Sequence, residues 1–221
     1  MAEMVAIMGE TGHGKSHSIK YLNPDETIII NADKKSLPFK GWKNLYNSEK
    51  KNYAITSKAR DIIEALDKIN KNEAYKNVKH IVIDTLSAVM WDDEMSRMKE
   101  KGYDKWIDLA YSIYGILDKC ISLRNDLIVF CMFHTQDLLD EMGNHFYRIQ
   151  TSGQKLQKIK IESRFPMVLH AKCQYGDTGN EYFFETQANY STAKSPEGMF
   201  ETKRIPNNLQ LVADAIRAYN Q

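Results

Sequence analysis

The chain has almost no excess of charge of either sign. Its 221 residues include 30 Lys and Arg against 29 Asp and Glu, which gives a formal net charge of +1. A basic field over the whole surface, of the kind by which histone-like proteins hold polyanions, is therefore excluded. Any nucleic-acid site must be a local patch of basic residues.

Cysteine is scarce as well. There are three cysteines, Cys120, Cys131 and Cys173, and they lack the spacing of metal ligands. An odd number without such spacing indicates reduced thiols in a cytosolic compartment, and the role expected for each is core packing.

Long hydrophobic runs are also missing. The apolar run before Gly9 is too short for a signal peptide and carries Glu3, and no window approaches a membrane span. No internal repeat or low-complexity linker divides the sequence. With 43% hydrophobic residues, a chain of this length fits one compact α/β domain over residues 1–221. We expect a soluble, cytoplasmic protein with no membrane partner.

What the sequence does have is a glycine-rich octapeptide, Gly9–Ser16, around which the rest is organised. It follows the apolar run Met4–Met8 and precedes a predicted short helix that ends at Tyr21, so G-x-x-x-x-G-K-[ST] stands between a strand and a helix. Such a loop supplies the closely spaced backbone N–H donors that a phosphate chain needs, whereas the alternative is a chance glycine turn. The predicted phosphate-binding residues are Gly9, Glu10, Thr11, Gly12, His13, Gly14, Lys15, Ser16 and His17.

Two side chains of this loop have predicted roles of their own, and a third residue complements them. Lys15 would reach the β- and γ-phosphate oxygens, and the Ser16 hydroxyl would bind Mg²⁺. The run HIVIDT is an apolar strand that ends in Asp84, which has the form of a Walker B element. Asp84 would accept from a water of the Mg²⁺ shell or from Ser16, and the alternative is an Asp that caps a helix. Ser16 and Asp84 are thus the predicted metal residues.

Two further buried strands end in polar side chains. Thr27–Asn31 is β-branched without alternation, which favours a strand buried on both faces of a parallel sheet, and it leads to Asp33. Leu127–Phe133 is a similar run, predicted to end at His134, Thr135 and Gln136. His134 or Gln136 could sense the γ-phosphate, because either side chain can donate to a phosphate oxygen, although a plain turn is the alternative. Ligands of parallel sheets sit at these carboxyl strand ends.

The remaining patterns complete a fold of the α/β class. Ser57 is predicted to cap a helix that continues to Ile69, and a core-facing helix is predicted over residues 106–121. The acidic, Met-rich stretch 87–101 is predicted to be a solvated helix. Two strands, 167–171 and 182–186, are joined by a glycine turn into a hairpin appended to the sheet. A last helix is expected to bury Leu209, Val212, Ile216 and Tyr219.

One segment carries the local basic patch that the net charge hides. Between Asn144 and Arg164, Phe146 and Tyr147 accompany a set of cations with Glu162 as the one acid. Cations track a phosphate backbone and aromatic faces stack on unpaired bases, so we predict single-stranded DNA binding, with a solvated hairpin or a subunit contact as alternatives. The candidate DNA-binding residues are Arg148, Lys155, Lys158, Lys160 and Arg164.

Several stretches together resemble a known family. They are the phosphate loop, NADKKSLPFKGW, HIVIDT, the strand ending in FHTQ, and the tail FFETQANYSTAKSPEGMFETKRIPNNLQLVADAIRAY. They resemble the single-domain phage AAA-family ATPases with a RecA-like core, and phage RecA-like single-strand annealing proteins are similar in build. The resemblance implies a RecA-like P-loop fold and ATP hydrolysis with Mg²⁺. It also implies a homo-oligomer that works with phage recombination or replication proteins in the host cytoplasm.

The resemblance also implies site residues. Lys15 and Ser16 match the Walker A pair, Asp84 matches the Walker B carboxylate, and Asp33 matches the acid that orients the attacking water. Asp is shorter than the Glu usual at that position, which implies slow turnover, and Thr85 stands where the group often has a second acid. The predicted catalytic set is Lys15, Asp33, Asp84, His134 and Gln136.

RecA-like ATPases often complete their site with a cation from the next subunit, because the developing phosphoryl charge must be stabilised. By tail position the candidates are Lys194 and Arg204, with exposed-loop cations as the alternative. The core is expected over about residues 1–140, the basic loop and hairpin over about 141–190, and the C-terminal loop and helix over 191–221.

Three functions remain open on the sequence. The first is an ATPase that uses its nucleotide state to control an oligomer on single-stranded DNA. The second is a nucleotide or small-molecule kinase, which would need a lid with arginines that only residues 148–164 could provide. The third is a nucleotide-bound assembly module with little turnover.

Overall fold

The structure is a computed structural model that describes residues 1–102, 104–139, 141–152, 158, 160–177 and 179–220. Its centre is a sheet whose inner strands are unbroken apolar runs, buried on both faces as parallel strands are. The inner strands are β1 (Glu3–Gly9), β2 (Thr27–Asn31), β4 (His80–Asp84) and β5 (Ile128–Leu139). The outer strands are β3 (Tyr53–Ile55), β6 (His145–Ile149), β7 (Met167–Gln174), β8 (Glu181–Glu185) and β9 (Arg204–Pro206).

The strand order is β3-β2-β4-β5-β1-β7-β8-β9, and β6 pairs with β5 away from this path. All pairs from β3 to β7 are parallel, whereas β8 and β9 are antiparallel to their neighbours. A mainly parallel sheet with a C-terminal hairpin extension is therefore confirmed. Because β1 lies between β5 and β7, the loop that follows β1 stands in the middle of the carboxyl edge of the sheet.

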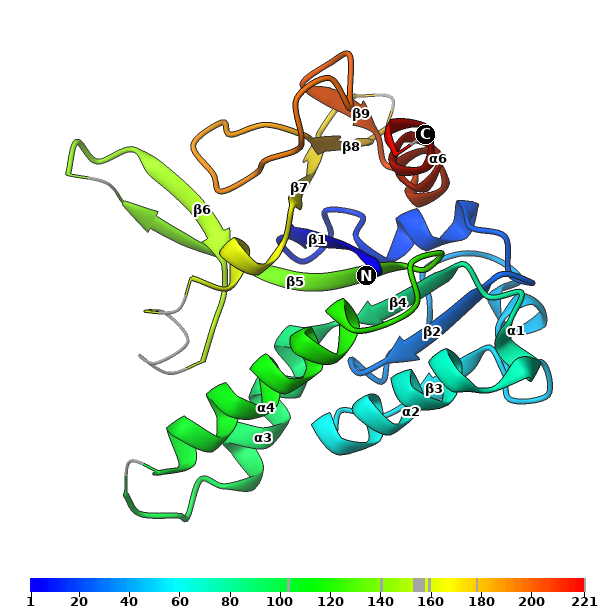
Figure 1. The fold of residues 1–221 in the computed structure, drawn as a ribbon. Coiled ribbons are helices and arrows are strands. Elements are labelled where there is room, and N and C mark those ends of the chain that lie inside the picture. The colour runs from blue at the N-terminus through cyan, green and yellow to red at the C-terminus, as the bar shows by residue number, and fades with distance from the viewer. Residues whose placement is uncertain (103, 140, 153–157, 159, 178, 221) are drawn as a thin grey trace.

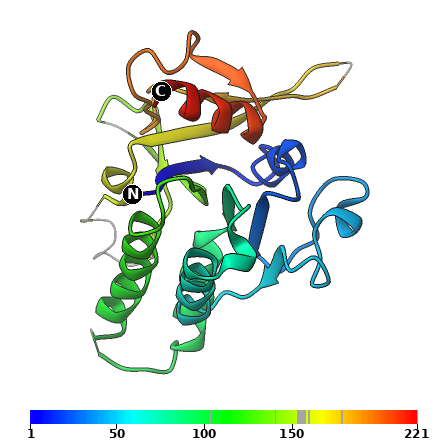
Figure 2. The same ribbon diagram turned by 45° about the vertical axis from the view of Figure 1, so that its right-hand side comes forward.

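Helices cover both faces of this sheet (Figure 1 and Figure 2). One face carries α2 (Ala59–Lys71), α3 (Leu86–Ser96) and α4 (Asp104–Ile121), and the other carries η1 (Ser16–Tyr21), α1 (Trp42–Leu45) and α6 (Leu209–Tyr219). Two short 3₁₀ turns, η2 (Glu73–Tyr75) and η3 (Ile161–Arg164), lie in connections. Over the described residues, no helix is both long and apolar enough to cross a bilayer.

The buried strands supply a core to each layer because successive side chains point to opposite faces. In β1, Met4, Ala6 and Met8 belong to the cluster with α2, α3 and α4, whereas Val5 and Ile7 belong to the cluster with α6. A strand without polar alternation is thus what a sheet covered on both faces requires.

The expected end of β5 at residues 134–136 is wrong. The strand continues to Leu139 and pairs antiparallel with β6, from Thr135 opposite Ile149 to Leu139 opposite His145. The hydrophobic run does end at Phe133, but the backbone beyond it finds hydrogen-bond partners in β6. The result is a two-stranded ribbon, formed by residues 135–139 and 145–149, that leaves the sheet on the left of Figure 1.

Three expectations about helices also need correction. Ser57 does not cap α2, which begins after Lys58, because the Ser57 hydroxyl hydrogen-bonds to Asp92 of α3 instead. The first half of α3, up to Met90, is buried and not solvated. The apolar stripe of α6 ends at Ile216, since Tyr219 is 48% exposed. The core-facing helix over 106–121 is confirmed as α4.

Candidate functional site

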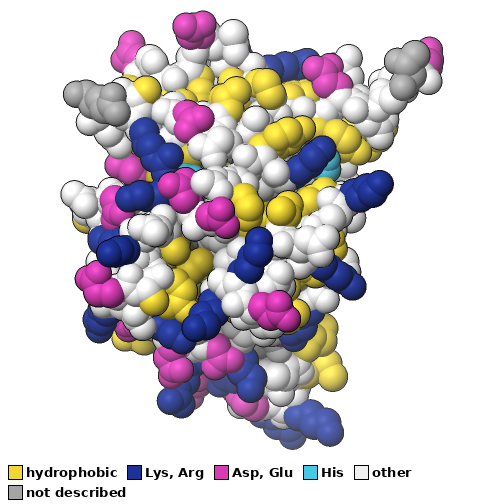
Figure 3. Space-filling model, turned by 90° about the vertical axis from the view of Figure 1, so that its right-hand side faces the viewer, with side chains coloured by type: hydrophobic (Ala, Val, Ile, Leu, Met, Phe, Trp, Pro, Cys, Tyr) yellow, Lys and Arg dark blue, Asp and Glu magenta, His cyan; other side chains and the backbone are white. Residues whose placement is uncertain are grey.

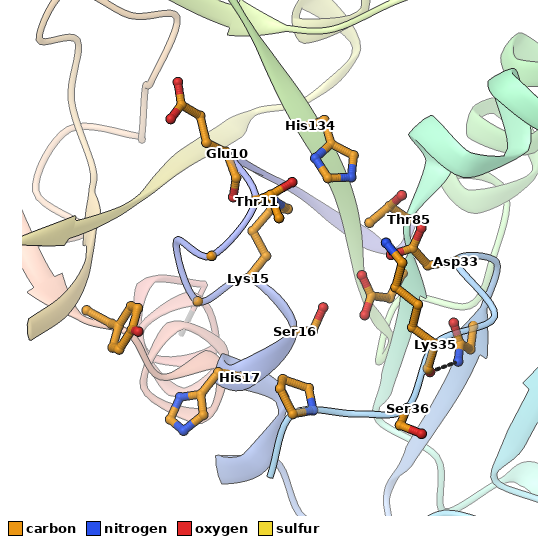
Figure 4. Close-up of a pocket in the computed structure, with 16 residues that line it drawn as sticks. Glu10, Thr11, Lys15, Ser16, His17, Asp33, Lys35, Ser36, Thr85 and His134 are labelled. Carbon is orange, nitrogen blue, oxygen red and sulfur yellow. Dashed lines mark hydrogen bonds and ion pairs between the residues drawn. The ribbon is translucent and has the colours of Figure 1, made fainter. Parts of the chain in front are cut away.

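A cavity of about 380 Å³ lies where the carboxyl ends of β1, β2, β4 and β5 meet. Figure 4 shows its labelled side chains converging from the loop after β1, from the segment after β2 and from the ends of β4 and β5. Its lining residues are Glu10, Thr11, Gly12, Gly14, Lys15, Ser16, His17, Asn31, Asp33, Lys35, Ser36, Pro38, Asp84, Thr85, His134 and Tyr182. The sequence-predicted loop thus lines the cavity, apart from Gly9 and His13, which lie beside it.

The glycine-rich loop folds around the ammonium of Lys15. Lys15 Nζ donates to the carbonyl oxygens of Gly9 and Glu10, at 2.6 and 2.9 Å. Burial lowers the pKa of Lys15 to about 8, although the nearby carboxylates of Asp84 and Asp33 act in the opposite direction. The loop can close in this way because Gly14 adopts a φ of +85°, which L side chains rarely adopt. A phosphate oxygen can replace these carbonyl oxygens as the acceptor for Lys15.

Asp84 is buried at the end of β4 and is 3% exposed. Burial raises the pKa of Asp84 to about 6, against the effect of a hydrogen bond with Ser16. The second carboxyl oxygen, Oδ1, is buried and has no hydrogen-bond partner in the part of the chain that the structure describes. The peptide bond between Asp84 and Thr85 is cis. Thr85 itself caps α3, because its hydroxyl accepts from the backbone N–H of Ala88.

The Ser16 and Asp84 pair suits Mg²⁺. Mg²⁺ takes hard oxygen ligands and keeps several waters, so that one or two protein oxygens suffice alongside phosphates. An orphaned, buried carboxyl oxygen beside a serine hydroxyl provides such a pair. No group of three or more His, Cys, Asp or Glu side chains within the described ranges could hold an ion by itself. Any Mg²⁺ here would therefore depend on the ligand's phosphates for the rest of its shell.

Asp33 reaches the cavity because the ends of β2 and β4 are bound together. The backbone N–H groups of Ala32 and Asp33 donate to the carbonyl oxygen of Asp84, at 2.7 and 3.0 Å. The Asp33 carboxylate forms an ion pair with Lys35 at 3.0 Å, and the Lys35 side chain is 71% exposed. Because the lysine of this pair is in solvent, its attraction to the half-buried Asp33 is screened, and we expect Lys35 to release Asp33 at low cost.

His134 lies next to Gly9 in the register of β5 and β1. Its backbone N–H donates to Ser87 Oγ at 2.9 Å, and its ring stacks on Trp91, with centroids 5.0 Å apart. Burial, helped by the charge of Lys15, lowers the pKa of His134 to about 4. The ring is therefore neutral at pH 7, and its buried Nε2 has no partner among the described residues.

Gln136 does not join His134. It lies two residues farther along the ribbon, opposite Arg148 in the register, and is not part of the cavity lining. The prediction that either residue could sense a phosphate assumed that the strand ended there. Since β5 continues into the ribbon, only His134 stands at the edge of the cavity.

The described members of the candidate DNA-binding set lie in different elements. Arg164, the last residue of η3, packs against α4, where it donates to Tyr114 Oη at 3.0 Å and to Asp118 Oδ1 at 3.1 Å. Arg148 belongs to the ribbon, Lys158 and Lys160 are exposed, and Lys155 lies outside the described residues. Figure 3 shows the opposite side of the molecule, the right-hand side of Figure 1, where cationic and anionic side chains are mixed.

The two tail cations lie away from the cavity. Arg204 places its guanidinium 4.6 Å from the ring of Phe183, and its Nη1 donates to Gln174 at 3.4 Å. Lys194 pairs its backbone with Val168 while its side chain is exposed. Neither residue reaches this chain's own site, so their assignment to a neighbouring subunit stays a prediction.

Sequence reasoning missed several residues of the site. Lys35, Ser36 and Pro38 line the cavity shortly after Asp33, yet the sequence analysis assigned none of them to the site. Ser87 and Trp91 support His134 from α3, and nothing in a single sequence pairs them with β5.

Comparison with known proteins agrees with this architecture. The sequence profile of the AAA domain family matches residues 1–196. A KaiC-like protein from the hyperthermophilic archaeon Pyrococcus horikoshii OT3 has a similar structure, with a TM-score of 0.51 and 14% identity over 92% of this chain and 84% of that one. The flagellar accessory protein FlaH from Methanocaldococcus jannaschii gives a TM-score of 0.45 and 15% identity, covering 92% and 83%. At such identities the KaiC-like structure supports the fold alone. No curated protein matches the chain significantly.

Proposed function

Because this chain belongs to the AAA domain family, we propose that its cavity binds ATP and hydrolyses it with Mg²⁺. One observation carries the proposal. The buried ammonium of Lys15, the hydroxyl of Ser16 and the orphaned oxygen of Asp84 line a single cavity at the carboxyl edge of a RecA-like sheet. A cation and a free carboxyl oxygen in one cavity suit a triphosphate and its metal better than a neutral ligand.

Each residue then has a role that follows from its position. Lys15 would exchange the carbonyls of Gly9 and Glu10 for β- and γ-phosphate oxygens. Ser16 and Asp84 would hold Mg²⁺, which supplies charge neutralisation on those oxygens.

Two other side chains complete the proposed mechanism. Asp33, once released by Lys35, would orient the attacking water. The neutral ring of His134 would donate to a γ-phosphate oxygen if its proton lies on Nε2, the nitrogen that has no partner.

We further propose that the ATPase acts on single-stranded DNA in phage recombination or replication, as a homo-oligomer. The support is the continuity of β5, which places His134 at the cavity and then forms one strand of the solvated ribbon. Tyr147 and His145 stack at 6.4 Å on this ribbon, and exposed Lys158 and Lys160 follow it in the chain. A change at the γ-phosphate could therefore move an aromatic and basic element through one strand.

The two rival functions have weaker support. A kinase needs mobile arginines above its acceptor, but Arg164 is held by α4 through Tyr114 and Asp118. A nucleotide-bound module with little turnover is favoured by the Lys35 ion pair, which occupies the Asp33 carboxylate.

Phosphate release separates these functions. We expect the wild-type chain to hydrolyse ATP with Mg²⁺, faster with single-stranded DNA, and Lys15→Ala to lose both ATP binding and hydrolysis. Transfer of the phosphoryl group to an added nucleoside monophosphate would favour the kinase instead. Tight ATP binding without phosphate release, with or without DNA, would favour the assembly module. Lys50→Ala, at an exposed lysine away from the cavity lining, is the matched control.

A further inference from the structure

The cavity has an end that the phosphate chemistry does not use. In Figure 4, His134 and Thr85 lie at one end of the cavity and His17 and Ser36 at the other, with Lys15 and Ser16 between them. If the γ-phosphate lies near Lys15, Asp84 and His134, the rest of the nucleotide must extend towards His17. The end around His17 therefore has to accommodate the ribose and the base.

This end is walled by flat side chains. Tyr182, from β8, lies with its ring centroid 6.1 Å from that of His17, at an interplanar angle of 32°. Pro38, which is exposed, lines the same cavity. Burial and the charge of Lys20 lower the pKa of His17, so its ring is neutral at pH 7. Neutral rings at the end of an otherwise polar cavity provide a surface for another flat ring.

Tyr182 also lies directly against the phosphate loop. A Cβ atom built on Gly14 would stand 2.9 Å from Tyr182 Cδ1 and 3.3 Å from both polar atoms of the Asn207 amide. Asn207 donates its backbone N–H to the carbonyl oxygen of Tyr182, and its side-chain amide is buried without a partner among the described residues. The C-terminal hairpin thus brings an aromatic face to the last glycine of the loop.

We propose that Tyr182, with His17 and Pro38, forms the slot that binds the base of the nucleotide, and that Tyr182 supplies the stacking face. This inference rests on the proposed function, because it assumes that the cavity holds a nucleoside triphosphate. Stacking of a base on an aromatic side chain changes affinity by about 5- to 100-fold when the ring is removed. Tyr182 would then raise the affinity for a nucleoside triphosphate over that for the bare phosphates, although it lies outside the predicted phosphate-binding residues.

The test compares two ligands that differ in the base. Titration calorimetry with Mg²⁺ would measure the affinities for ATP and for tripolyphosphate, which has the phosphates without ribose or base. We expect Tyr182→Ala to weaken ATP binding about 5- to 100-fold while leaving tripolyphosphate binding within about twofold. Tyr182→Phe should bind both ligands like the wild type. Tyr175→Ala, at a tyrosine that is 75% exposed on the same hairpin, should also change neither affinity.

Other outcomes overturn the inference in distinguishable ways. Equal losses for both ligands would mean that Tyr182 only supports the loop at Gly14. Unchanged ATP binding in Tyr182→Ala, or equal wild-type affinities for ATP and tripolyphosphate, would place the base elsewhere while the proposed function stands. If the wild-type chain binds neither ligand, the proposed function is wrong and the base slot falls with it.

Discussion

The free energy of unfolding of this protein should decrease as the pH is lowered through the range where His80 would gain a proton. His80 is fully buried at the start of β4. Its Nε2 lies 2.9 Å from Nη2 of Arg217 in α6, and its Nδ1 lies 3.2 Å from the hydroxyl of Thr27 in β2. Since a guanidinium can only donate, Nε2 must accept, which requires a neutral ring with its proton on Nδ1.

The size of the effect follows from the pKa of His80. Burial, with the charges of Arg217 and Lys79 and against that of Asp214, lowers the pKa from 6.5 to about 4. Between these two values the unfolded chain binds more protons than the folded one. The contribution of His80 to stability is therefore fully present above pH 6.5 and is lost as the pH falls towards 4. At about 1.4 kcal/mol per pH unit, the loss reaches roughly 3 kcal/mol near pH 4.

Urea denaturation of the wild type and of His80→Gln at pH values from 7.5 to 4 would measure this loss. The glutamine can still accept from Arg217 but cannot gain a proton, so the variant should lose about 3 kcal/mol less than the wild type over that range. The pKa values of His134 and His170 are also lowered by burial, to about 4 and 3, and they contribute equally to both proteins. His145→Gln, at an exposed histidine, is the control. Parallel pH profiles for the wild type and His80→Gln would refute the reasoning.

Two further predictions concern the proposed function. Asp33→Asn should abolish phosphate release while ATP affinity stays close to wild type, because the ion pair with solvent-exposed Lys35 contributes little to the site. A phosphate-release assay measures the rate, calorimetry measures the affinity, and Asp177→Asn at the hairpin turn is the control. An unchanged rate would remove Asp33 from the mechanism. Lys158→Ala combined with Lys160→Ala should weaken single-stranded DNA binding and lower the magnitude of the slope of log K against log salt by about 1.4. Fluorescence anisotropy measures the binding, and the double variant Lys50→Ala, Lys76→Ala is the control. An unchanged slope would show that Lys158 and Lys160 do not contact phosphates.

Local patterns predicted much of this structure. The strands β2 and β4 have the bounds that their sequences indicate, and β1 is one residue longer at each end than the apolar run Met4–Met8. Burial on both faces gives such strands an unbroken run of apolar residues, which the sequence shows directly. The same apolar runs predicted where the phosphate loop and Asp84 lie, since a polar residue directly after such a strand must lie at the carboxyl edge of the sheet.

What failed depended on partners far away in the chain. Ser57 does not cap α2, because its hydroxyl is hydrogen-bonded to Asp92. The strand β5 is longer than predicted because it pairs with β6, and the sequence of β5 does not indicate this pairing. Tyr182 reaches Gly14 only because the hairpin of β7 and β8 lies beside β1. Hydrophobic periodicity carries no information about such pairings, so a single sequence could not place these residues.

The position of β1 explains why the proposed ligand would be bound at both ends. Its neighbour on one side, β5, brings His134 to the cavity and then continues into the ribbon. Its neighbour on the other side, β7, leads through the hairpin to Tyr182. The loop after β1 lies between β5 and β7. The γ-phosphate would therefore lie next to the strand that forms the ribbon, and the base would lie next to the C-terminal hairpin.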